Sequence, residues 1–377
     1  MKPAVVISGV SFSEMGPLSV LKDALRVLAE QHSDDYELIA IVHRSALFDI
    51  PGIKFLEYPE VKSSWLRRLK FEYLDLHRLS EQLRPYLWLS MHDISPRVTA
   101  TMQAVYCHNP APFFRLRFQD LRLDWKFALF TLFYGYLYGI NLRRNKWVIV
   151  QQDWLRQAFR RRYGIDRIIV AHPEERAAHA SAAWNGKKSE GRNYCFFYPC
   201  FPRVFKNVES LLLAAELLEK NGQSSFELWL TFDGSENRYA AELVKRFALL
   251  KRVKFLGLLK REEVFERYGA ADCLVFPSLL ETWGMPISEC KTFHKPMLLA
   301  DLPYAHETVG DYDQAVFFPP AAPQLLAEKM RAASAGETIF GRVSAAKIAP
   351  PYCESWRELF QMLLADASAG KIERNGA

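Results

Sequence analysis

Short apolar runs alternate with stretches of helical periodicity along the chain. In the N-terminal half the runs are rich in β-branched and aromatic residues, which predicts buried strands. Leucines at positions 18, 21, 25 and 28 follow a helical spacing, and residues 65–83 carry a second apolar helical face. The expected strands of this half lie at residues 1–10, 36–42, 53–56, 87–93, 104–110, 147–150 and 168–170. Such alternation is typical of an α/β unit.

The C-terminal half repeats the pattern. Its expected strands lie at residues 194–199, 226–232, 253–258 and 272–276, and its expected helices at 208–218 and 262–268. A chain of 377 residues is too long for one ordinary core. We therefore expect two facing Rossmann-like domains, at residues 1–171 and 193–352. Residues 172–192 show no clear apolar period and are interpreted as a linker.

The clearest local pattern follows the apolar run at residues 272–276, which ends at a proline. Gly284 permits an unusual backbone turn, and Pro286 suits the first position of a helix because its φ is already fixed there. We expect this helix to begin near Met285 or Pro286. Its free N–H groups and positive dipole end would face the carboxyl edge of a parallel sheet, where a phosphate fits.

Two carboxylates flank this turn. Glu281 lies in the loop before the helix, and Glu289 follows eight residues later, about one turn inside the helix. Carboxylates accept hydrogen bonds from vicinal hydroxyls, so the pair suits a ligand that has sugars on both sides of a phosphate. This description fits a nucleotide sugar.

The stretch from Glu281 to Glu289 contains Gly-Met-Pro and is followed by His-Lys-Pro at 294–296 and by an aromatic run at 311–320. This arrangement resembles the E-x7-E signature region of glycosyltransferase family 4. The resemblance covers nearly the whole chain and is specific between about residues 194 and 320. It implies an α/β fold of the GT-B type, with two Rossmann-like domains facing an interdomain cleft. It also implies a retaining, metal-independent transfer from a nucleotide-diphosphate sugar, with no cofactor.

The same resemblance implies roles for residues of the C-terminal half. Glu289 is expected to hold the ribose and Glu281 the sugar hydroxyls. Lys206 matches the lysine that clamps the donor diphosphate in this family, while Arg203 lies nearer to that lysine than the usual arginine. A lysine directly before a helix opposes the helix dipole, which favours an anionic partner, although a solvated loop cation is the alternative. The other expected donor contacts are Gly257, Leu258, Thr282, Trp283, Gly284 and Met285.

Three residues of the N-terminal half complete the candidate site. His92 and His108 each follow an expected strand. The resemblance places His108 beside the donor sugar, as a catalytic residue, and His92 on the acceptor side; otherwise each is an ordinary hydrogen-bonded loop histidine. Gly16, in the loop after the first strand, is expected near the donor phosphate or the acceptor, with a plain βα turn as the alternative. By analogy, a last helix at about 353–377 packs back on the N-terminal domain.

Composition narrows the class of protein. Half of the residues are hydrophobic and 24% are charged, as in a globular protein. The six cysteines show no metal-binding spacing, which favours a reducing cytoplasm. The first apolar run is too short for a signal peptide, and the longest, at residues 127–140, falls short of the ~20 residues that span a bilayer.

Charge is unevenly placed. The net charge is +6, but residues 115–167 hold twelve Lys or Arg against four Asp or Glu, a local balance of +8. Residues 113–144 interleave basic with aromatic side chains, a pattern suited to an anionic membrane surface and a lipid-linked acceptor. An ordinary buried helix at 127–138 is the alternative. Nucleic-acid binding is disfavoured because no recognition motif accompanies the charge.

The favoured function is therefore a glycosyltransferase of surface polysaccharide synthesis, cytoplasmic or peripheral on the inner face of the membrane. Its partners would be a nucleotide sugar and a glycan or lipid-linked acceptor. Two rivals share the fold. A nucleotide-sugar epimerase would need acid and base residues in the cleft and no acceptor, and a catalytically inactive membrane-associated scaffold would have no use for Glu281, Glu289 and Lys206 together.

Overall fold

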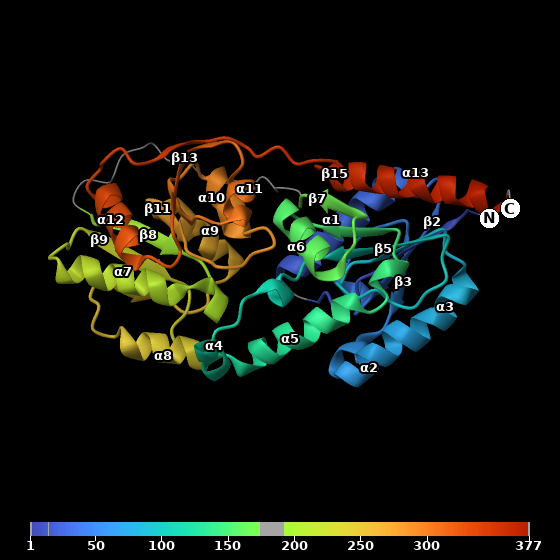
Figure 1. The fold of residues 1–377 in the computed structure, drawn as a ribbon, viewed down its shortest axis with the longest axis horizontal. Coiled ribbons are helices and arrows are strands. Elements are labelled where there is room, and N and C mark those ends of the chain that lie inside the picture. Colours follow the sequence, from blue (N-terminus) through green and yellow to red (C-terminus); the bar gives the residue numbers. More distant parts are fainter. Residues whose placement is uncertain (1, 14, 174–191, 376–377) are drawn as a thin grey trace. The chain divides into compact units, whose positions relative to one another are not determined.

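The computed structural model describes residues 2–13, 15–173 and 192–375 (Figure 1). The chain forms two compact units. The first comprises Met1–Phe113, Leu132–Glu174 and Ile348–Ala377, and the second comprises Phe114–Thr131 and Glu175–Lys347. Most of the expected linker at 172–192 lies outside the described residues.

The first unit is built on a parallel sheet of eight strands in the order β15-β7-β6-β5-β4-β1-β2-β3. The order reverses direction at β1, which pairs with β2 on one side and with β4 on the other. Ligands of open α/β sheets bind at the carboxyl ends of strands where such a reversal occurs. The strands are β1 (Ala4–Ser8), β2 (Glu37–Val42), β3 (Ile53–Glu57), β4 (Leu87–Ser90), β5 (Met102–Cys107), β6 (Trp147–Val150), β7 (Ile168–Ala171) and β15 (Tyr352–Cys353).

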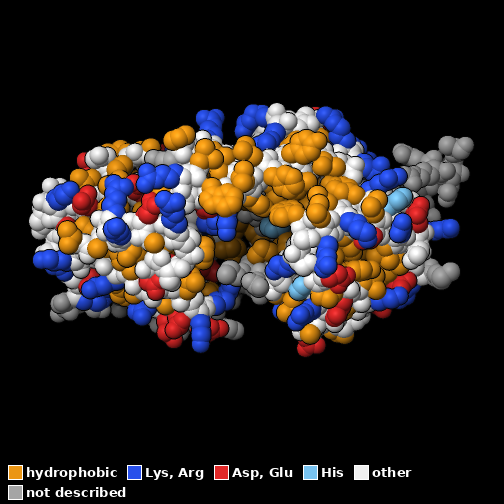
Figure 2. Space-filling view, turned by 90° about the horizontal axis from the view of Figure 1, so that it is seen from below, with side chains coloured by type: hydrophobic (Ala, Val, Ile, Leu, Met, Phe, Trp, Pro, Cys, Tyr) orange, Lys and Arg blue, Asp and Glu red, His pale blue; other side chains and the backbone are white. Residues whose placement is uncertain are grey.

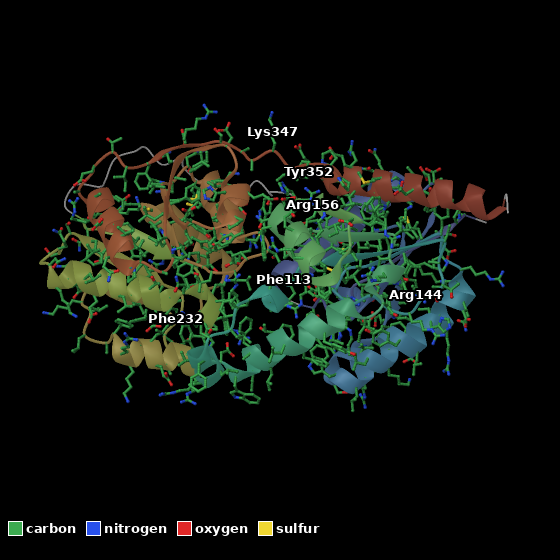
Figure 3. All side chains as sticks on the ribbon, in the orientation of Figure 1. Phe113, Arg144, Arg156, Phe232, Lys347 and Tyr352 are labelled. Atoms are coloured by element: carbon green, nitrogen blue, oxygen red, sulfur yellow. The ribbon has the colours of Figure 1, made fainter. Side chains whose placement is uncertain are left out.

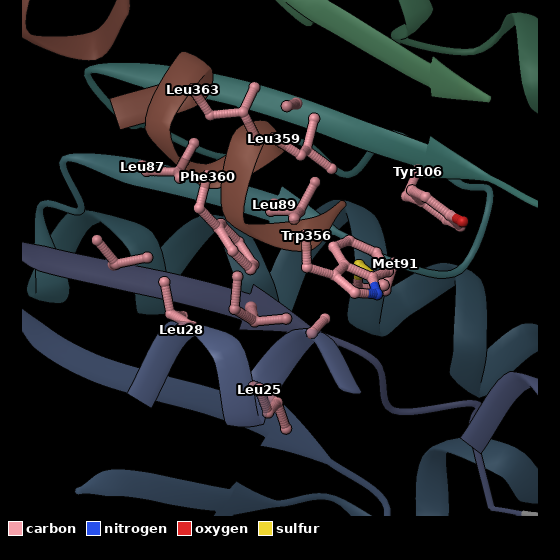
Figure 4. Packing of buried hydrophobic residues seen from close by; sticks show 14 of the residues in the cluster. Leu25, Leu28, Leu87, Leu89, Met91, Tyr106, Trp356, Leu359, Phe360 and Leu363 are labelled. Carbon is pink, nitrogen blue, oxygen red and sulfur yellow. The ribbon is translucent and has the colours of Figure 1, made fainter. Parts of the chain in front are cut away.

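Alternate residues of the central strands face opposite sides of this sheet. Val5 and Ile7 of β1 belong to a large core cluster, while Ala4 and Val6 belong to a smaller one. In the larger cluster, α1 (Met15–His32) packs against α13 (Trp356–Asn375) and β2, and α13 lies over β4 and β5 (Figure 4). The C-terminal helix thus lies on the unit formed by the N-terminal strands.

The opposite face of the sheet carries one long helical segment, as the apolar pattern at 65–83 predicted. The segment consists of α2 (Trp65–Lys70), a π-helical turn at Phe71–Asp75 and α3 (Leu76–Leu83). Phe71 and Leu76 are buried against the smaller cluster. Turns of π-helix are rare and occur mostly as single-turn bulges within α-helices.

The edge of the first sheet is held by a buried arginine. Arg156 of α6 (Asp153–Tyr163) donates hydrogen bonds to the carbonyl oxygens of Ala349, at 2.8 Å, and Pro351, at 3.2 Å (Figure 3). These bonds anchor the returning chain beside β7, where β15 completes the sheet.

The second unit contains a sheet of seven strands in the order β10-β9-β8-β11-β12-β13-β14, parallel except for β14. The order reverses at β8, between β9 and β11. The strands are β8 (Tyr194–Tyr198), β9 (Phe226–Leu230), β10 (Val253–Phe255), β11 (Cys273–Phe276), β12 (Met297–Ala300), β13 (Tyr312–Phe318) and β14 (Gly341–Val343). The helices are α7 (Val208–Lys220), α8 (Arg238–Arg246), α9 (Arg261–Ala270), α10 (Met285–Thr292), α11 (Pro303–Val309) and α12 (Pro323–Ser334).

A segment from the N-terminal half also belongs to the second unit. Residues Phe114–Thr131 include α4 (Phe118–Leu123) and the start of α5 (Trp125–Gly139). The rings of Phe127 and Phe205 lie 5.0 Å apart between centroids, so this segment packs on the loop that follows β8. The sequence suggested a continuous domain at 1–171, because nothing local marks these residues as part of another unit.

The predicted α/β class is confirmed, since each unit is a mainly parallel sheet accompanied by helices. No helix within the described ranges is long and apolar enough to cross a bilayer.

Candidate functional site

Two loops meet where the strand order of the second sheet reverses. One follows β8 and the other follows β11. The backbone N–H of Leu279 donates to the carbonyl oxygen of Phe205 at 2.7 Å. The side-chain amide of Asn207 donates to the carbonyl oxygens of Pro277, at 3.2 Å, and Pro320, at 2.9 Å. Asn207 adopts a positive φ of 54°, a conformation that asparagine tolerates better than most residues. The bonds to Phe205 and Pro277 hold the two loops together, and the bond to Pro320 ties them to the segment that follows β13.

An ion pair joins the loops. The ammonium nitrogen of Lys206 lies 2.5 Å from Glu281 Oε1, and the two side chains are only 17% and 14% exposed. The ammonium also lies 5.5 Å from the ring centre of Phe205 and 5.8 Å from that of Phe276. Screening by water is weak for such a pair, so the structure brings a cation and a carboxylate together at the sheet edge.

The turn before α10 has the geometry that the sequence predicted. Gly284 has φ 86° and ψ 56°, and α10 begins at Met285 with Pro286 in its first turn. A Cβ on Gly284 would lie 3.4 Å from atoms of Phe276 and Ile287. The left-handed backbone and the close neighbours both favour glycine. The N-terminus of α10, which is the positive end of the helix dipole, therefore comes shortly after Glu281 in the sequence and follows the carboxyl end of β11.

The side chains of the turn point in different directions. Trp283 is buried and donates from Nε1 to Ser288 Oγ at 2.9 Å, and its carbonyl oxygen accepts a hydrogen bond from the Thr308 hydroxyl. Thr282 is half-buried, while Met285 is 40% exposed. Trp283 thus fixes the turn from within, and Met285 is open to solvent.

Glu289 lies on α10 and faces α9. Its Oε2 accepts a hydrogen bond from the Tyr268 hydroxyl at 3.1 Å, and its Oε1 lies 3.6 Å from the guanidinium of Arg261. Burial raises the pKa of Glu289, and this effect outweighs the opposing influence of Arg261 and of the Tyr268 hydrogen bond. A polar ligand that hydrogen-bonds the carboxylate would compensate part of this burial cost.

Three further expected donor contacts have distinct surroundings. Arg203 donates to Asp124 Oδ2 at 2.8 Å, so this guanidinium already has an anionic partner. Gly257 has φ 74°, and a Cβ there would lie 3.2 Å from a carboxylate oxygen of Asp233. Leu258 is 63% exposed. The loop after β10 therefore presents backbone and one apolar side chain to solvent.

In the first unit, His92 lies beyond the end of β4 but is only 1% exposed. Its Nε2 is 2.8 Å from Glu72 Oε1, which also accepts a hydrogen bond from Arg68 Nε at 2.7 Å. Burial lowers the pKa of His92. Burial alone would raise the pKa of Glu72, but His92 and Arg68 outweigh it and the pKa is lowered. His92 therefore belongs to a buried charged cluster within this unit.

His108 follows β5 and is more open. Its side chain is 20% exposed, and Nδ1 lies 3.2 Å from Asp93 Oδ1. Asp93 has a φ of 71° and accepts hydrogen bonds from the His108 backbone N–H, at 2.7 Å, and the Tyr138 hydroxyl, at 2.9 Å. The Phe12 ring packs edge-on against the imidazole at 4.9 Å. Asp93 therefore fixes the position of this histidine.

Gly16 lies in a helix and not in the loop where it was expected. Gly16 is in the first turn of α1, which begins at Met15, and the loop after β1 is correspondingly shorter. Pro17, also in the first turn, explains this, because proline is well suited to the start of a helix.

Sequence reasoning missed Asp124, Arg261 and Tyr268 as neighbours of the site. Asp124 is 79 residues from Arg203, and no local pattern connects the two. Tyr268 lies on the expected helix at 262–268 and Arg261 just before it, and only the pairing of β11 with β8 brings this helix beside Glu289.

Comparison with known proteins gives a family match within the second unit. Residues 181–343 match the family described as glycosyl transferases group 1. The O-antigen chain mannosyltransferase B of Escherichia coli is 31% identical over 107 residues, a stretch that spans 28% of each protein.

Solved structures extend the likeness to the fold of the whole chain. A sucrose-phosphate synthase from Thermosynechococcus elongatus has a TM-score of 0.63 and 15% identity, with 99% of both chains covered. HepE of Anabaena, solved in complex with UDP-glucose, has a TM-score of 0.57 and 13% identity, covering 99% of this chain and all of the other. At such identities the likeness shows the fold, which is that of the GT-B glycosyltransferases.

Proposed function

We propose that this protein transfers a sugar from a nucleotide-diphosphate sugar to a glycan or lipid-linked acceptor in surface polysaccharide synthesis. The observation that carries the proposal is the Lys206–Glu281 ion pair, buried at the reversal point of the second sheet. A phosphate is attracted to Lys206 and the start of α10, while sugar hydroxyls suit Glu281. The similarity to an O-antigen mannosyltransferase and to a structure containing UDP-glucose supports this substrate class.

Each residue of the site has a defined task in this proposal. Lys206 and Arg203 hold the diphosphate together with the amide groups near Gly284, and they stabilise the negative charge that develops as it departs. Glu289 binds the ribose, for which Tyr268 orients its carboxylate. Backbone groups at Gly257 and Leu258 contact the base. Thr282, Trp283 and Met285 shape the turn around the phosphates.

The transfer proceeds with retention and needs no metal ion. The bond between the anomeric carbon and the phosphate oxygen breaks as the acceptor oxygen approaches from the same face. The acceptor proton passes to the departing phosphate, and Glu281 holds the sugar hydroxyls through the exchange. We place His108 beside the donor sugar, as a catalytic group whose imidazole Asp93 orients. An anionic membrane surface presents the lipid-linked acceptor. His92 has a positioning role, since its imidazole is buried.

A donor-consumption assay tests the proposal. The purified protein is incubated with a panel of UDP-, GDP- and dTDP-sugars, and thermal shifts first identify the nucleotide that stabilises it. The expected result is slow release of free sugar and nucleoside diphosphate, accelerated by the acceptor. Interconversion of sugars without release would instead indicate an epimerase, and binding without turnover an inactive scaffold. Lys206→Met serves as the control that lacks the essential ammonium group.

A further inference from the structure

The segment Phe114–Thr131 exposes an unusual amount of apolar surface. Phe118 is 90% exposed, Trp125 57%, Leu129 54% and Leu121 43%. The same helix α5 continues with exposed Leu132, Phe133 and Tyr136. Figure 2 shows hydrophobic side chains gathered on the face that carries α5, with Lys and Arg side chains beside them. Soluble proteins rarely expose large contiguous apolar patches without a partner.

The charges of this segment are sorted by side. Its only acidic residues are Asp120 and Asp124. Asp120 is fully buried and accepts hydrogen bonds from the Arg117 backbone N–H, at 2.8 Å, and guanidinium. Asp124 is 11% exposed and binds Arg203. Both carboxylates are therefore neutralised on the inner side.

The outer side is cationic. Arg115, Arg122 and Lys126 are exposed, and Lys126 lies 5.9 Å from the ring of Trp125. Aromatic rings with cationic neighbours are typical of surfaces that settle at the headgroup level of a bilayer. A protein partner or a second copy would require acidic groups to match this charge, whereas anionic lipids supply them as a continuous surface.

The buried side chains of the segment contact the loop that follows β8, which we call the donor loop. Asp124 binds Arg203 at 2.8 Å, and Phe205 packs against Phe127, at 5.0 Å, and Phe114, at 6.4 Å. Arg203 and Phe205 belong to the same short loop as Lys206. A surface that binds the exposed side of this segment therefore also fixes the position of the proposed diphosphate-binding loop.

We propose that Phe114–Thr131 is a membrane-docking element that seats the donor loop at an anionic lipid surface. Trp125, Leu129 and Phe118 enter the headgroup region, while Arg115, Arg122 and Lys126 bind lipid phosphates. The inference rests on the proposed function for its purpose, because a donor loop held at the bilayer meets a lipid-linked acceptor. The basic residues at 143–146, which belong to the same basic stretch at 115–167, lie outside this element.

Vesicle co-sedimentation of the full chain tests the element directly. The vesicles are phosphatidylcholine with or without phosphatidylglycerol, at low and high salt. We expect the wild type to sediment with the anionic vesicles and salt to weaken binding. The triple variant R115E/R122E/K126E should lose about tenfold or more in vesicle affinity, since three charges that attract anionic lipid become three that repel it. The double variant W125S/L129S should bind the anionic vesicles more weakly, and its residual binding should keep the response to salt.

A matched control has the same change of charge outside the element. Arg143, Arg144 and Lys146 are exposed, and R143E/R144E/K146E should retain vesicle binding. An equal loss in this control, or a wild type that stays in the supernatant at low salt, overturns the proposal. A concentration-dependent dimer abolished by W125S/L129S would assign the surface to a second copy instead.

Nucleotide binding separates this inference from the proposed function. The thermal shift with the stabilising nucleotide, measured without vesicles, should be unchanged in both docking variants, which also shows that they fold. Vesicle binding without any nucleotide response would defeat the proposed function and leave the docking element standing.

Discussion

Lys206 and Glu281 form an ion pair at 2.5 Å across two loops that are separated by 75 residues in the sequence. Each side chain is mostly buried, and the pair lies where the strand order of the second sheet reverses. In the proposed function the carboxylate of Glu281 binds the sugar hydroxyls, and the ammonium group of Lys206 binds the diphosphate. The ion pair also fixes the positions of both side chains, so substitution of one residue changes the electrostatic environment of the other.

The two signature glutamates should be separable by kinetics. Glu281→Ala is expected to lower turnover by about a hundredfold or more and to change nucleotide affinity much less, because its ligand is the transferring sugar. Glu289→Ala should do the reverse. Calorimetry with the nucleoside diphosphate, together with turnover measurements, decides the matter. Glu262, which is exposed, supplies the control as Glu262→Ala. Equal loss of nucleotide affinity in both signature variants rules out this division of roles.

Lys206→Met should weaken binding of the nucleoside diphosphate by roughly ten- to a hundredfold, the range for a lost hydrogen bond to a charged group. Methionine places an unbranched apolar side chain beside the rings of Phe205 and Phe276 but removes the charge. Lys220→Met, at an exposed site, should have no effect.

Turnover of the wild type should persist in EDTA, since Lys206 supplies the positive charge. Loss of turnover in EDTA with recovery in manganese would refute the metal-free mechanism.

Gly284→Ala and Gly222→Ala form a matched pair, because both glycines have positive φ, at 86° and 77°. Each substitution should lower the free energy of unfolding by about 1–2 kcal/mol, the cost of a left-handed residue with a side chain. Only Gly284→Ala should also reduce donor turnover, because Gly284 forms the turn before α10. Urea unfolding and the donor-consumption assay together test this, and a comparable loss of turnover at Gly222 would contradict it.

The stability of the protein should depend on pH through Glu289. Its pKa is raised above the ordinary value of 4.5 by burial, so the folded state retains a proton that the unfolded state releases. Stability from this group is therefore fully present below about pH 4.5 and falls as the pH rises through the folded-state pKa. Glu289→Gln should remove this loss, and its advantage in melting temperature over the wild type should be greater at pH 7 than at pH 4. A constant difference between the two proteins would contradict the assignment.

The buried cluster of Arg68, Glu72 and His92 should act on stability. Glu72→Ala leaves the largely buried guanidinium of Arg68 without its partner and is expected to cost about 3–5 kcal/mol. Glu81→Ala, which removes an exposed partner of His77 on the next helix, should change stability by less than about 0.5 kcal/mol. Denaturant unfolding compares the two variants. A small effect at Glu72 would show that the cluster is not a structural anchor.

Much of the fold was predictable because it depends on local chemistry. Apolar runs such as 147–150 and 273–276 form buried strands wherever the sheet lies, and β6 and β11 occupy those residues. The turn at Gly284 and the start of α10 follow from the backbone preferences of glycine and proline, which act over a few residues. The helical face at 65–83 was likewise evident, although its π-helical turn was not.

Contacts between distant segments were decided by the tertiary structure alone. Asp124 meets Arg203, and Phe127 meets Phe205, because Phe114–Thr131 folds into the second unit, and no periodicity records such a choice. His92 follows a strand just as His108 does, yet the π-helical turn places Glu72 against it and buries it. Whether a side chain is buried, and which residues it contacts, depends on the order of the strands and on where the helices pack. The sequence alone therefore determined which residues are able to form a site, and the packing of the sheets decided which of them meet.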